Sequence, residues 1–507
     1  MERKWWSLLA VCLATFMLLL DITVVNVALP KIQKALHTDL TGLQWVVDAY
    51  TLLLSAFTLS MGTLADRFGR RRLFVIGVGL FTFASLLCGL ATSATFLHLA
   101  RGLQGIGGAA MFATSLALIA QEFQGPDRGT AIAAWGATIG GAVAVGPLVG
   151  GALTDGLGWE WIFYVNVPIG IGTVILAKTQ AGESRDPDAK RLDWAGLITF
   201  SLGLFALIFG LLRGNAEGWG STQIVGSLVA AAVLLAAFVI FEWRQDHAMF
   251  DLNLFRKPAF SGVSYGTFAI GAGMFAMFLY ITIYMQSVIG MTPLEAGVRF
   301  LPLTLFAFLV PLATRRLVAR IPARVPLTIG LTLVGIGLLL MRGAQPDSQW
   351  TTLLAGFMVS GFGIGLANPS IASTALGVVP AVRSGMASGI NNTMRIAGVA
   401  TGIAALGAVF QSKITDSLHT LLPQAPPGFA DGVAASGTQA ANQAPPQFHQ
   451  QAVHAAGVAF TDAFNDILLI GALILFSGAL AVFALVRQSD FIPHGAGAPE
   501  EAEAAAA

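Results

Sequence analysis

Long apolar runs with almost no charged residues recur along the whole chain, and they restrict it to a fold that lies in lipid. A helix needs about 20 mostly apolar residues to cross a bilayer, because it rises ~1.5 Å per residue. Only 11% of the 507 residues are charged, whereas a soluble domain carries about 25%. The sequence therefore predicts an all-α polytopic membrane protein.

Fourteen runs are long and apolar enough to be membrane spans. The first follows Arg3 and Lys4, as a signal peptide would, but it continues past Asp21 without a small-residue cleavage site, so we expect an uncleaved span. The order of six spans, two spans and six spans suggests two halves flanking an inserted pair, and transporters with repeated halves bind substrate between them. The runs are 6–28, 44–64, 73–91, 95–121, 130–153, 161–178, 194–212, 223–241, 259–286, 296–317, 325–342, 351–374, 384–411 and 464–486.

The distribution of Lys and Arg orients the spans. With the N-terminus in the cytoplasm, twenty of the 28 basic residues fall in inner segments, six in outer segments, and Arg101 and Arg395 inside spans. Inner segments of membrane proteins carry such an excess, so we expect a multi-pass protein of a bacterial-type cell membrane with both termini in the cytoplasm. The net charge of +1 gives no basic field for nucleic acid, and the cysteines and histidines show no metal-ligand spacing.

The spans divide the chain into predicted domains. The stretch 412–460, rich in Pro, Gln, Ala and Gly, predicts a poorly ordered extracytoplasmic loop, and residues 488–507 a disordered cytoplasmic tail. The remaining segments are an N-terminal six-helix bundle (1–182), a charged linker with two inserted helices (183–250) and a C-terminal six-helix bundle (251–411 and 461–487).

A motif rich in glycine and arginine stands between the second and third spans. It reads Gly62-Thr-Leu-Ala-Asp66-Arg67-Phe-Gly69-Arg70-Arg71-Arg72. The glycines allow a tight turn and close backbone approach, and Asp66 suits the positive N-terminal end of a neighbouring helix. In a fold of two halves, Asp66 should face the start of the thirteenth span, near Ser384 and Gly385, where it would stabilise the cytoplasm-closed state. We expect a conformational switch at Gly62, Asp66, Arg67, Gly69 and Arg70; alternatively, the arginines only set the topology.

Small residues recur in the fifth span, at Gly136, Gly140, Gly146, Gly150 and Gly151. Small residues four apart let helices pack closely, and Pro147 loosens the backbone hydrogen bonding of this span. Ordinary packing of membrane helices would give the same pattern.

The motif between the second and third spans resembles the signature loop of the major facilitator superfamily, and the glycine pattern resembles the motif of its antiporters. The runs 20–30 and 159–170 are similar to hallmarks of the fourteen-helix drug:proton antiporter branch. The resemblance covers the chain except the predicted loop and tail. It implies a major facilitator fold with 14 transmembrane helices that exports amphipathic or cationic drugs, or secondary metabolites, by proton-coupled alternating access. We expect a monomer with the proton as coupling ion and no other cofactor.

Three ionisable residues fall at a similar depth in the outer half of the N-terminal bundle: Asp21, Asp48 and Arg101. Helix rise places Asp21 ~22 Å from the inner interface. Contact with an arginine favours a charged aspartate and burial favours a neutral one, so an aspartate that changes contacts between two states can carry a proton. We expect Asp21 to be the principal carrier and Asp48 to assist. The alternatives are a hydrogen bond from Asp21 to Thr23 or Asn26, and a water-facing Asp48.

Aromatic, methionine and amide side chains are the candidates for the substrate cavity. Aromatic faces bind cations and methionine adapts to varied shapes, although each such residue alone is more readily structural. Asn391, Asn392 and Arg395 share a broad helix face and could line the cavity or equally hold helices together. The thirteenth span carries no acid, unlike that of some related exporters. The candidates are Trp45, Tyr50, Phe57, Tyr265, Met274, Phe278, Tyr284, Asn391, Asn392 and Arg395.

Two other functions fit the same sequence. One is a dedicated exporter of a single endogenous compound, such as an antibiotic, a siderophore or a lipid. The other is a non-transporting membrane receptor, against which the intramembrane Asp21 and Arg101 argue. No catalytic constellation is present, so we do not expect an enzyme.

Overall fold

The computed structural model consists of helices and their connections, with no strand in the residues it describes. The expected all-α class is therefore confirmed. The structure describes residues 2–38, 40–185, 193–244, 250, 252–318, 320–380, 383–426, 428–443 and 447–492.

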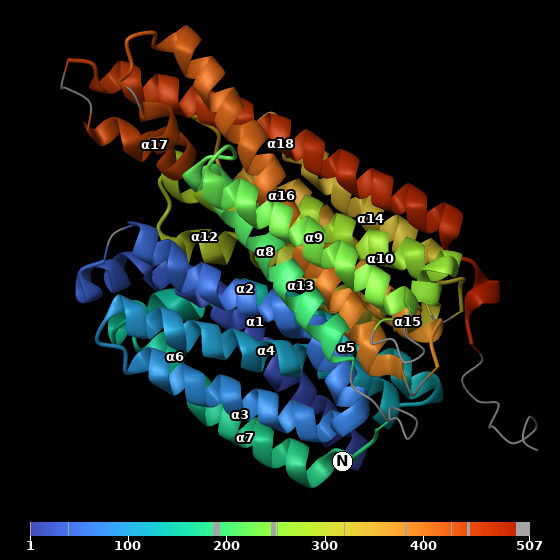
Figure 1. Cartoon of the computed structure of the whole chain (residues 1–507). Coiled ribbons are helices and arrows are strands. Elements are labelled where there is room, and N and C mark those ends of the chain that lie inside the picture. Colours follow the sequence, from blue (N-terminus) through green and yellow to red (C-terminus); the bar gives the residue numbers. More distant parts are fainter. Residues whose placement is uncertain are drawn as a thin grey trace, which may run out of the picture.

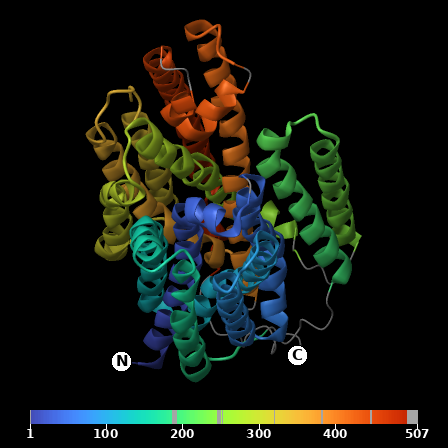
Figure 2. The ribbon, with the colours of Figure 1, turned by 90° about the vertical axis from the view of Figure 1, so that its left-hand side faces the viewer.

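Two helical bundles and a hairpin make up the molecule (Figure 1). The hairpin of α8 (Trp194–Glu217) and α9 (Thr222–Arg244) stands at one side of the molecule (Figure 2). The N-terminal bundle comprises α1 (Arg3–Leu36), α2 (Leu40–Phe68), α3 (Arg70–Gly89), α4 (Ala94–Glu122), α5 (Gly125–Gly156), α6 (Trp161–Tyr164) and α7 (Asn166–Gln180). The C-terminal bundle comprises η1 (Leu252–Arg256), α10 (Pro258–Ile270), η2 (Gly271–Phe275), α11 (Met277–Ile283), η3 (Tyr284–Val288), α12 (Pro293–Arg299), α13 (Leu301–Val318), α14 (Arg324–Leu340), α15 (Thr351–Gly377), α16 (Ser384–Leu421), α17 (Phe429–Ser436), η5 (Gly437–Gln443), α18 (His449–Leu485) and η6 (Gln488–Asp490).

Twelve helical segments of the described chain are long and apolar enough to cross a membrane. The other two predicted spans, 130–153 and 325–342, coincide with α5 and α14. The first is a 32-residue helix rich in glycine, and the second is an apolar helix of 17 residues. The helices thus occur where the sequence places all fourteen, although the count of fourteen spans itself stays a prediction.

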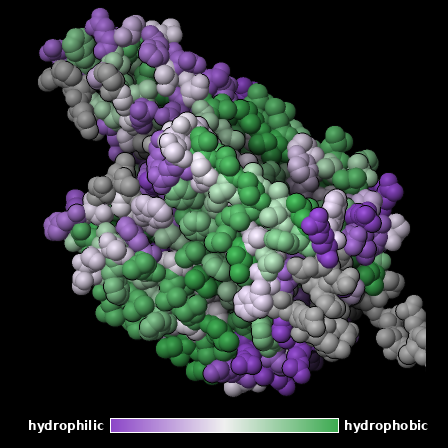
Figure 3. All heavy atoms as spheres, viewed as in Figure 1, coloured by the Kyte–Doolittle hydropathy of each residue, from purple (hydrophilic) through white to green (hydrophobic). Residues whose placement is uncertain are grey.

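The outer surface matches a lipid environment. Large apolar side chains are exposed on several helices, including Val233 on α9 at 62% and Leu480 on α18 at 69%. Figure 3 shows a broad hydrophobic belt across the middle of one face, with hydrophilic residues gathered at the two ends. A soluble protein would expose such a belt to water at a high cost.

The ninth predicted span is part of one continuous helical segment, Pro258–Val288, that contains two π-helical turns, η2 and η3. In these turns the backbone N–H of Ala276 bonds to the carbonyl of Gly271, and that of Ile289 to the carbonyl of Tyr284, both spanning five residues. Single π-helical turns within α-helices are frequent at functional sites in other proteins. The first of them, η2, packs on α16.

The prediction of a poorly ordered loop over 412–460 is wrong for most of its length. Helix α16 continues to Leu421, α17 and η5 lie within the stretch, and α18 begins at His449. The alanines that make the stretch look featureless are also the best helix formers, and the side chains of Val433 and Ala441 are fully buried. In the predicted tail, residues 493–507 lie outside the described residues.

The first and last described segments lie at the same end of the bundle. Arg3 donates to the Gln180 carbonyl at the end of α7, and Ile492 donates to the Gly377 carbonyl at the end of α15. This is the end at which α2 finishes and α16 starts, and it is the end that the charge distribution predicts to face the cytoplasm.

Candidate functional site

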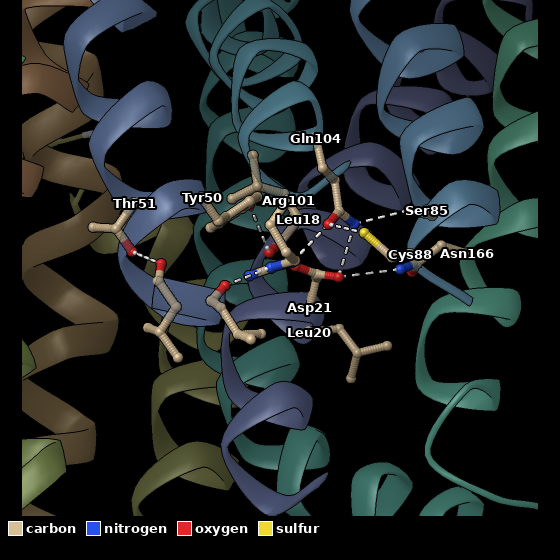
Figure 4. Close-up of polar contacts among 12 residues, drawn as sticks. Leu18, Leu20, Asp21, Tyr50, Thr51, Ser85, Cys88, Arg101, Gln104 and Asn166 are labelled. Atoms are coloured by element: carbon tan, nitrogen blue, oxygen red, sulfur yellow. Dashed lines mark hydrogen bonds and ion pairs between the residues drawn. The ribbon is translucent and has the colours of Figure 1, made fainter. Parts of the chain in front are cut away.

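A polar cluster lies fully buried in the N-terminal bundle, where α1, α3, α4 and α7 meet (Figure 4). Its centre is an ion pair in which Arg101 Nη1 lies 2.5 Å from Asp21 Oδ2, and both side chains are at most 1% exposed. An ion pair removed from water is costly unless further hydrogen bonds satisfy both partners. We call it the Asp21–Arg101 cluster; its other members are Gln104, Ser85, Cys88, Asn166 and Tyr50.

Neighbouring side chains supply those hydrogen bonds. Gln104 donates from Nε2 to Asp21 Oδ1 at 2.9 Å and to Ser85 Oγ at 2.8 Å, and it accepts from Arg101 at 2.6 Å. Asn166 Nδ2 lies 3.4 Å from Asp21 Oδ1. Three partners from two other helices thus bind the Asp21 carboxylate. The Thr23 hydroxyl donates instead to the carbonyls of Leu19 and Leu20, so the alternative of a hydrogen bond to Thr23 is wrong. The side chain of Asn26 lies outside the described residues.

Arg101 also connects the cluster to α2. Its Nε donates to the Val46 carbonyl at 2.9 Å, and its guanidinium lies 4.2 Å from the centre of the Tyr50 ring. Tyr50 is 1% exposed, so the structure places this cavity candidate against the ion pair. A displacement of Arg101 would therefore break or move its contacts with α2.

Asp48 does not join this cluster, and its predicted grouping with Asp21 and Arg101 is wrong. It lies 3.6 Å from Arg213, a residue of the inserted helix α8, and Arg213 also pairs with Glu217 at 2.7 Å. Arg213 further donates to Gln44 and lies 5.6 Å from the ring of Trp45. Trp45 thus packs against α8.

Arg213 is a residue that the sequence analysis missed, because its place at the end of a span assigned it to an outer segment. It is 5% exposed. A signal was present: a basic residue three to four positions before an acid on a helix face, as in Arg213 and Glu217, favours an ion-paired side chain.

At the end of the bundle that is predicted to face the cytoplasm, Asp66 binds the start of α16, as expected. Its carboxylate accepts hydrogen bonds from the backbone N–H groups of Gly385 at 3.0 Å and Met386 at 2.9 Å. Arg70 donates to Asp66 Oδ1 at 2.8 and 2.9 Å. A carboxylate at a helix N-terminus satisfies unpaired N–H groups and complements the helix dipole. This contact joins the two bundles.

Glycines make the contact possible. A Cβ at Gly62 would stand 2.5 Å from the Gly385 carbonyl oxygen, so only glycine lets α2 and α16 approach this closely. Gly69 has φ +108°, in the region that favours glycine, and turns the chain from α2 into α3. Of the predicted switch residues, only Arg67 takes no part in this contact; its guanidinium lies 5.2 Å from the centre of the Phe68 ring.

The small residues of α5 divide into two contacts. Gly146 and Gly150 pack on α1, against Thr23 and Val24, just beyond Asp21 in the sequence. Gly136 and Gly140 pack on Pro369 and Ala307 of the C-terminal bundle. Helix α5 therefore links the helix of the ion pair to the other half. Gly151 lies near Leu294, and the side chain of Pro147 lies outside the described residues.

We expect Gly146→Ala to destabilise the protein. The new Cβ would overlap Thr23 Oγ1 and stand 2.6 Å from the Thr23 Cβ, so rotating the side chain does not relieve the clash. Overpacking of this kind costs about 1–3 kcal/mol. Thermal unfolding of the purified protein in detergent measures the effect.

Gly129→Ala, in the same helix, is the matched control. A Cβ there would meet nothing within 4 Å, and replacing glycine by alanine in a helix gains up to about 1 kcal/mol. Equal melting temperatures for the two variants would contradict the α1–α5 contact.

A small cavity lies between the bundles, with room for about one water molecule. It is lined by Ile139 and Gly140 of α5 and, among others, by Phe275, Phe278 and Asn368 of the C-terminal bundle. The candidate Phe278 therefore lies at this cavity, and its contact with substrate stays a prediction.

The other cavity candidates have different surroundings. Tyr265 is 43% exposed and bonds to Ser477 on the outer surface, so its placement in the cavity is wrong. Tyr284 lies inside the C-terminal bundle, stacked on Phe464 at 4.8 Å, and does not line the cavity either. Met274 is fully buried in η2, and Phe57 is half-buried.

The polar residues of α16 lie between helices. This position is compatible with both predicted roles, lining the cavity and holding helices together. Asn391 accepts from Thr267 at 2.8 Å within the C-terminal bundle. Asn392 donates to the Phe112 carbonyl of the N-terminal bundle at 3.2 Å. Arg395 donates to Asn368, a residue that lines the cavity, at 2.9 Å.

Comparisons with known proteins agree with this geometry. A family model described as Major Facilitator Superfamily matches residues 11–403. The chain is 39% identical to the multidrug resistance protein Stp of Mycobacterium tuberculosis, over 83% of this chain and 78% of that protein. It is 30% identical to the tetracenomycin C resistance and export protein of Streptomyces glaucescens, over 96% of this chain and 93% of that protein. It is 35% identical to the puromycin resistance protein pur8 of Streptomyces alboniger, over 80% and 82%.

Solved structures show the same fold at low sequence identity. The proton:xylose symporter XylE superposes with a TM-score of 0.63 at 13% identity, over 96% of each chain. The human organic anion transporter MFSD10 superposes with a TM-score of 0.60 at 14% identity, over 94% of this chain and all of that one.

Proposed function

The chain belongs to the major facilitator superfamily, a family of membrane transporters, and we propose that it exports amphipathic drugs or secondary metabolites in exchange for protons. Similar proteins are named for resistance to multiple drugs, to tetracenomycin C and to puromycin, which supports drug export. Export by alternating access would proceed in a monomer with both termini in the cytoplasm and the proton as its only coupling ion.

The observation that carries proton exchange is the buried Asp21–Arg101 pair. A carboxylate fully removed from water keeps its charge only while the guanidinium and the amides stay in place. If Arg101 moves away as the bundles rearrange, neutral Asp21 becomes the favoured form, and the side chain takes up a proton. Returning Arg101 would release that proton on the other side of the membrane.

Two helices suit the transmission of this change. Helix α2 contacts Arg101 through Val46 and Tyr50, and at its other end it carries Gly62 and Asp66, which hold α16. Helix α5 contacts α1 beside Asp21 and contacts the C-terminal bundle through Gly136 and Gly140. A change at Asp21 on protonation can thus reach the interface between the bundles through both α2 and α5.

The test is a substrate screen in everted membrane vesicles, with and without a proton gradient. We expect accumulation of several amphipathic drugs that stops when an uncoupler collapses the gradient. Accumulation that is unaffected by the uncoupler would contradict proton exchange. A single accumulated compound would instead identify a dedicated exporter.

A further inference from the structure

Four arginines are buried in the described part of the chain, and only one of them lacks an acidic partner there. Arg70 pairs with Asp66, Arg101 with Asp21, and Arg213 with Asp48 and Glu217. Arg395, on α16, is 7% exposed and has no ion pair among the described residues. Buried charges in proteins are usually paired.

The contacts of Arg395 leave part of its guanidinium free. Nη1 donates to Asn368 Oδ1 at 2.9 Å, and the group lies 5.5 Å from the ring of Phe275. Nε and Nη2 have no hydrogen-bond partner in the described chain. A guanidinium presents its donors as a planar fork that matches an oxyanion, so two free N–H-bearing nitrogens on one edge can donate together to an anionic group.

No acid in the described part of the chain pairs with this fork. None of the predicted spans nine to thirteen contains Asp or Glu. Arg395 lies eleven residues from Ser384 at the start of α16, hence ~16 Å along the helix, about half the thickness of the hydrocarbon core.

A polar track on α16 leads from the cytoplasmic contact to Arg395. Each of its residues carries a buried polar atom with no partner in the described chain: Ser384 Oγ, Ser388 Oγ, Asn391 Nδ2, Asn392 Oδ1 and Arg395. Spacings of three and four residues place them on one helix face. Unpaired polar groups are costly inside a membrane, so this face is suited to a polar or hydrated guest.

The cavity between the bundles adjoins the track at Arg395. Its lining includes Phe275 and Asn368, the two residues that contact the guanidinium. Phe275 belongs to the π-helical turn η2, and a Cβ at Gly271 of that turn would stand 2.5 Å from the Arg395 carbonyl oxygen. The aromatic ring of Phe275 and the unpaired guanidinium of Arg395 thus lie together at the interface between the bundles.

We propose that Arg395 binds an anionic group of the exported molecule, such as a carboxylate or sulfonate, while Phe275 and Phe278 hold its apolar part. This inference rests on the proposed function, because it names the chemical class of the cargo. It departs from the cationic cargo that the family resemblance implies. It makes amphipathic acids, rather than lipophilic cations, the preferred molecules.

The test compares two dyes that share their rings and differ in charge: anilinonaphthalenesulfonate and phenylnaphthylamine, which lacks the sulfonate. Binding of each to the purified chain in lipid nanodiscs is followed by fluorescence. We expect the wild type to bind the acidic dye about 10- to 100-fold more tightly than the neutral dye, the range for one charge-assisted pair. Arg395→Gln should abolish this preference.

Two further variants separate charge recognition from folding. Arg395→Lys keeps the charge but loses the fork, so it should retain part of the preference. Arg316→Gln removes an exposed arginine at the end of α13 and should leave the preference unchanged. Equal affinity of the wild type for both dyes, or equal loss of both in Arg395→Gln, would overturn the proposal. So would displacement of the acidic dye by millimolar chloride, which would assign Arg395 to a small inorganic anion.

Proton-driven uptake of the same dyes into everted vesicles is measured separately. If the acidic dye binds through Arg395 but no dye is transported, the proposed function fails and the anion site stands. The gradient could instead drive transport of the acidic dye, the neutral dye and ethidium alike, with no effect of Arg395→Gln. In that case the anion site fails and the proposed function stands.

Discussion

Replacing Asp21 by Asn is expected to reduce proton-driven export to the level of empty vesicles, while exchange of cargo down its own gradient continues. Asparagine has nearly the same shape and can keep the contacts with Gln104 and Asn166, but it cannot carry a proton. Drug accumulation in everted vesicles measures the first activity and counterflow in proteoliposomes the second. A second readout is proton release on cargo binding, which the wild type should show and the variant should not.

Stability is the main confounding effect of this substitution. Asp21→Asn leaves Arg101 as an unpaired buried cation, and breaking a buried pair from one side costs about 3–5 kcal/mol. The double variant Asp21→Asn with Arg101→Gln removes both charges and should recover much of the stability without recovering coupling. Asp155→Asn, an exposed acid that pairs with Lys31, is the matched control and should transport normally. Proton-driven export by either Asp21 variant at the wild-type rate would refute Asp21 as the carrier.

The pairing of Asp21 with Arg101 was predictable because depth in the membrane can be counted along a helix. Both residues stand at a similar level, and an intramembrane charge needs a partner. Asp48 stands at that level too, but counting gives the height of a residue and not the direction in which it points. Its partner, Arg213, comes from the inserted helix α8. Helix α8 has no counterpart in either bundle. The sequences of the bundles therefore do not predict where it packs.

The contact of Asp66 with α16 was predictable for a different reason. The motif around Gly62 and Gly69 fixes a tight turn, and the arrangement of two halves places that turn opposite the start of the thirteenth span. Aromatic residues carry no such information, because Tyr265 on the outer surface and Phe278 at the cavity lie in the same apolar rod. In lipid, both the inside and the outside of a helix bundle are apolar.

Replacing Asp66 by Asn is expected to shift the protein toward a state that is open on the cytoplasmic side. The substitution replaces the carboxylate, which accepts hydrogen bonds from Gly385 and Met386 and pairs with Arg70, by a neutral amide. A hydrogen bond to a charged group contributes about 1.5–3 kcal/mol. Loss of one such bond changes the open-to-closed ratio by about 10- to 100-fold, and a transporter that closes poorly exports slowly.

A cysteine at position 388 reports this opening, because Ser388 is fully buried beside Gly389 where α16 meets α2. The background lacks Cys12 and Cys88, and an impermeant maleimide is applied to the cytoplasmic face of everted vesicles. We expect labelling of Ser388→Cys to be about 10-fold faster with Asp66→Asn, since exposure follows the open population. Asp127→Asn, which replaces a half-exposed acid that pairs with Lys4 in the first turn of α5, should not change the rate. Unchanged labelling and unchanged export in Asp66→Asn would show that the contact does not hold the two halves together, and the switch would then have to lie elsewhere on α2.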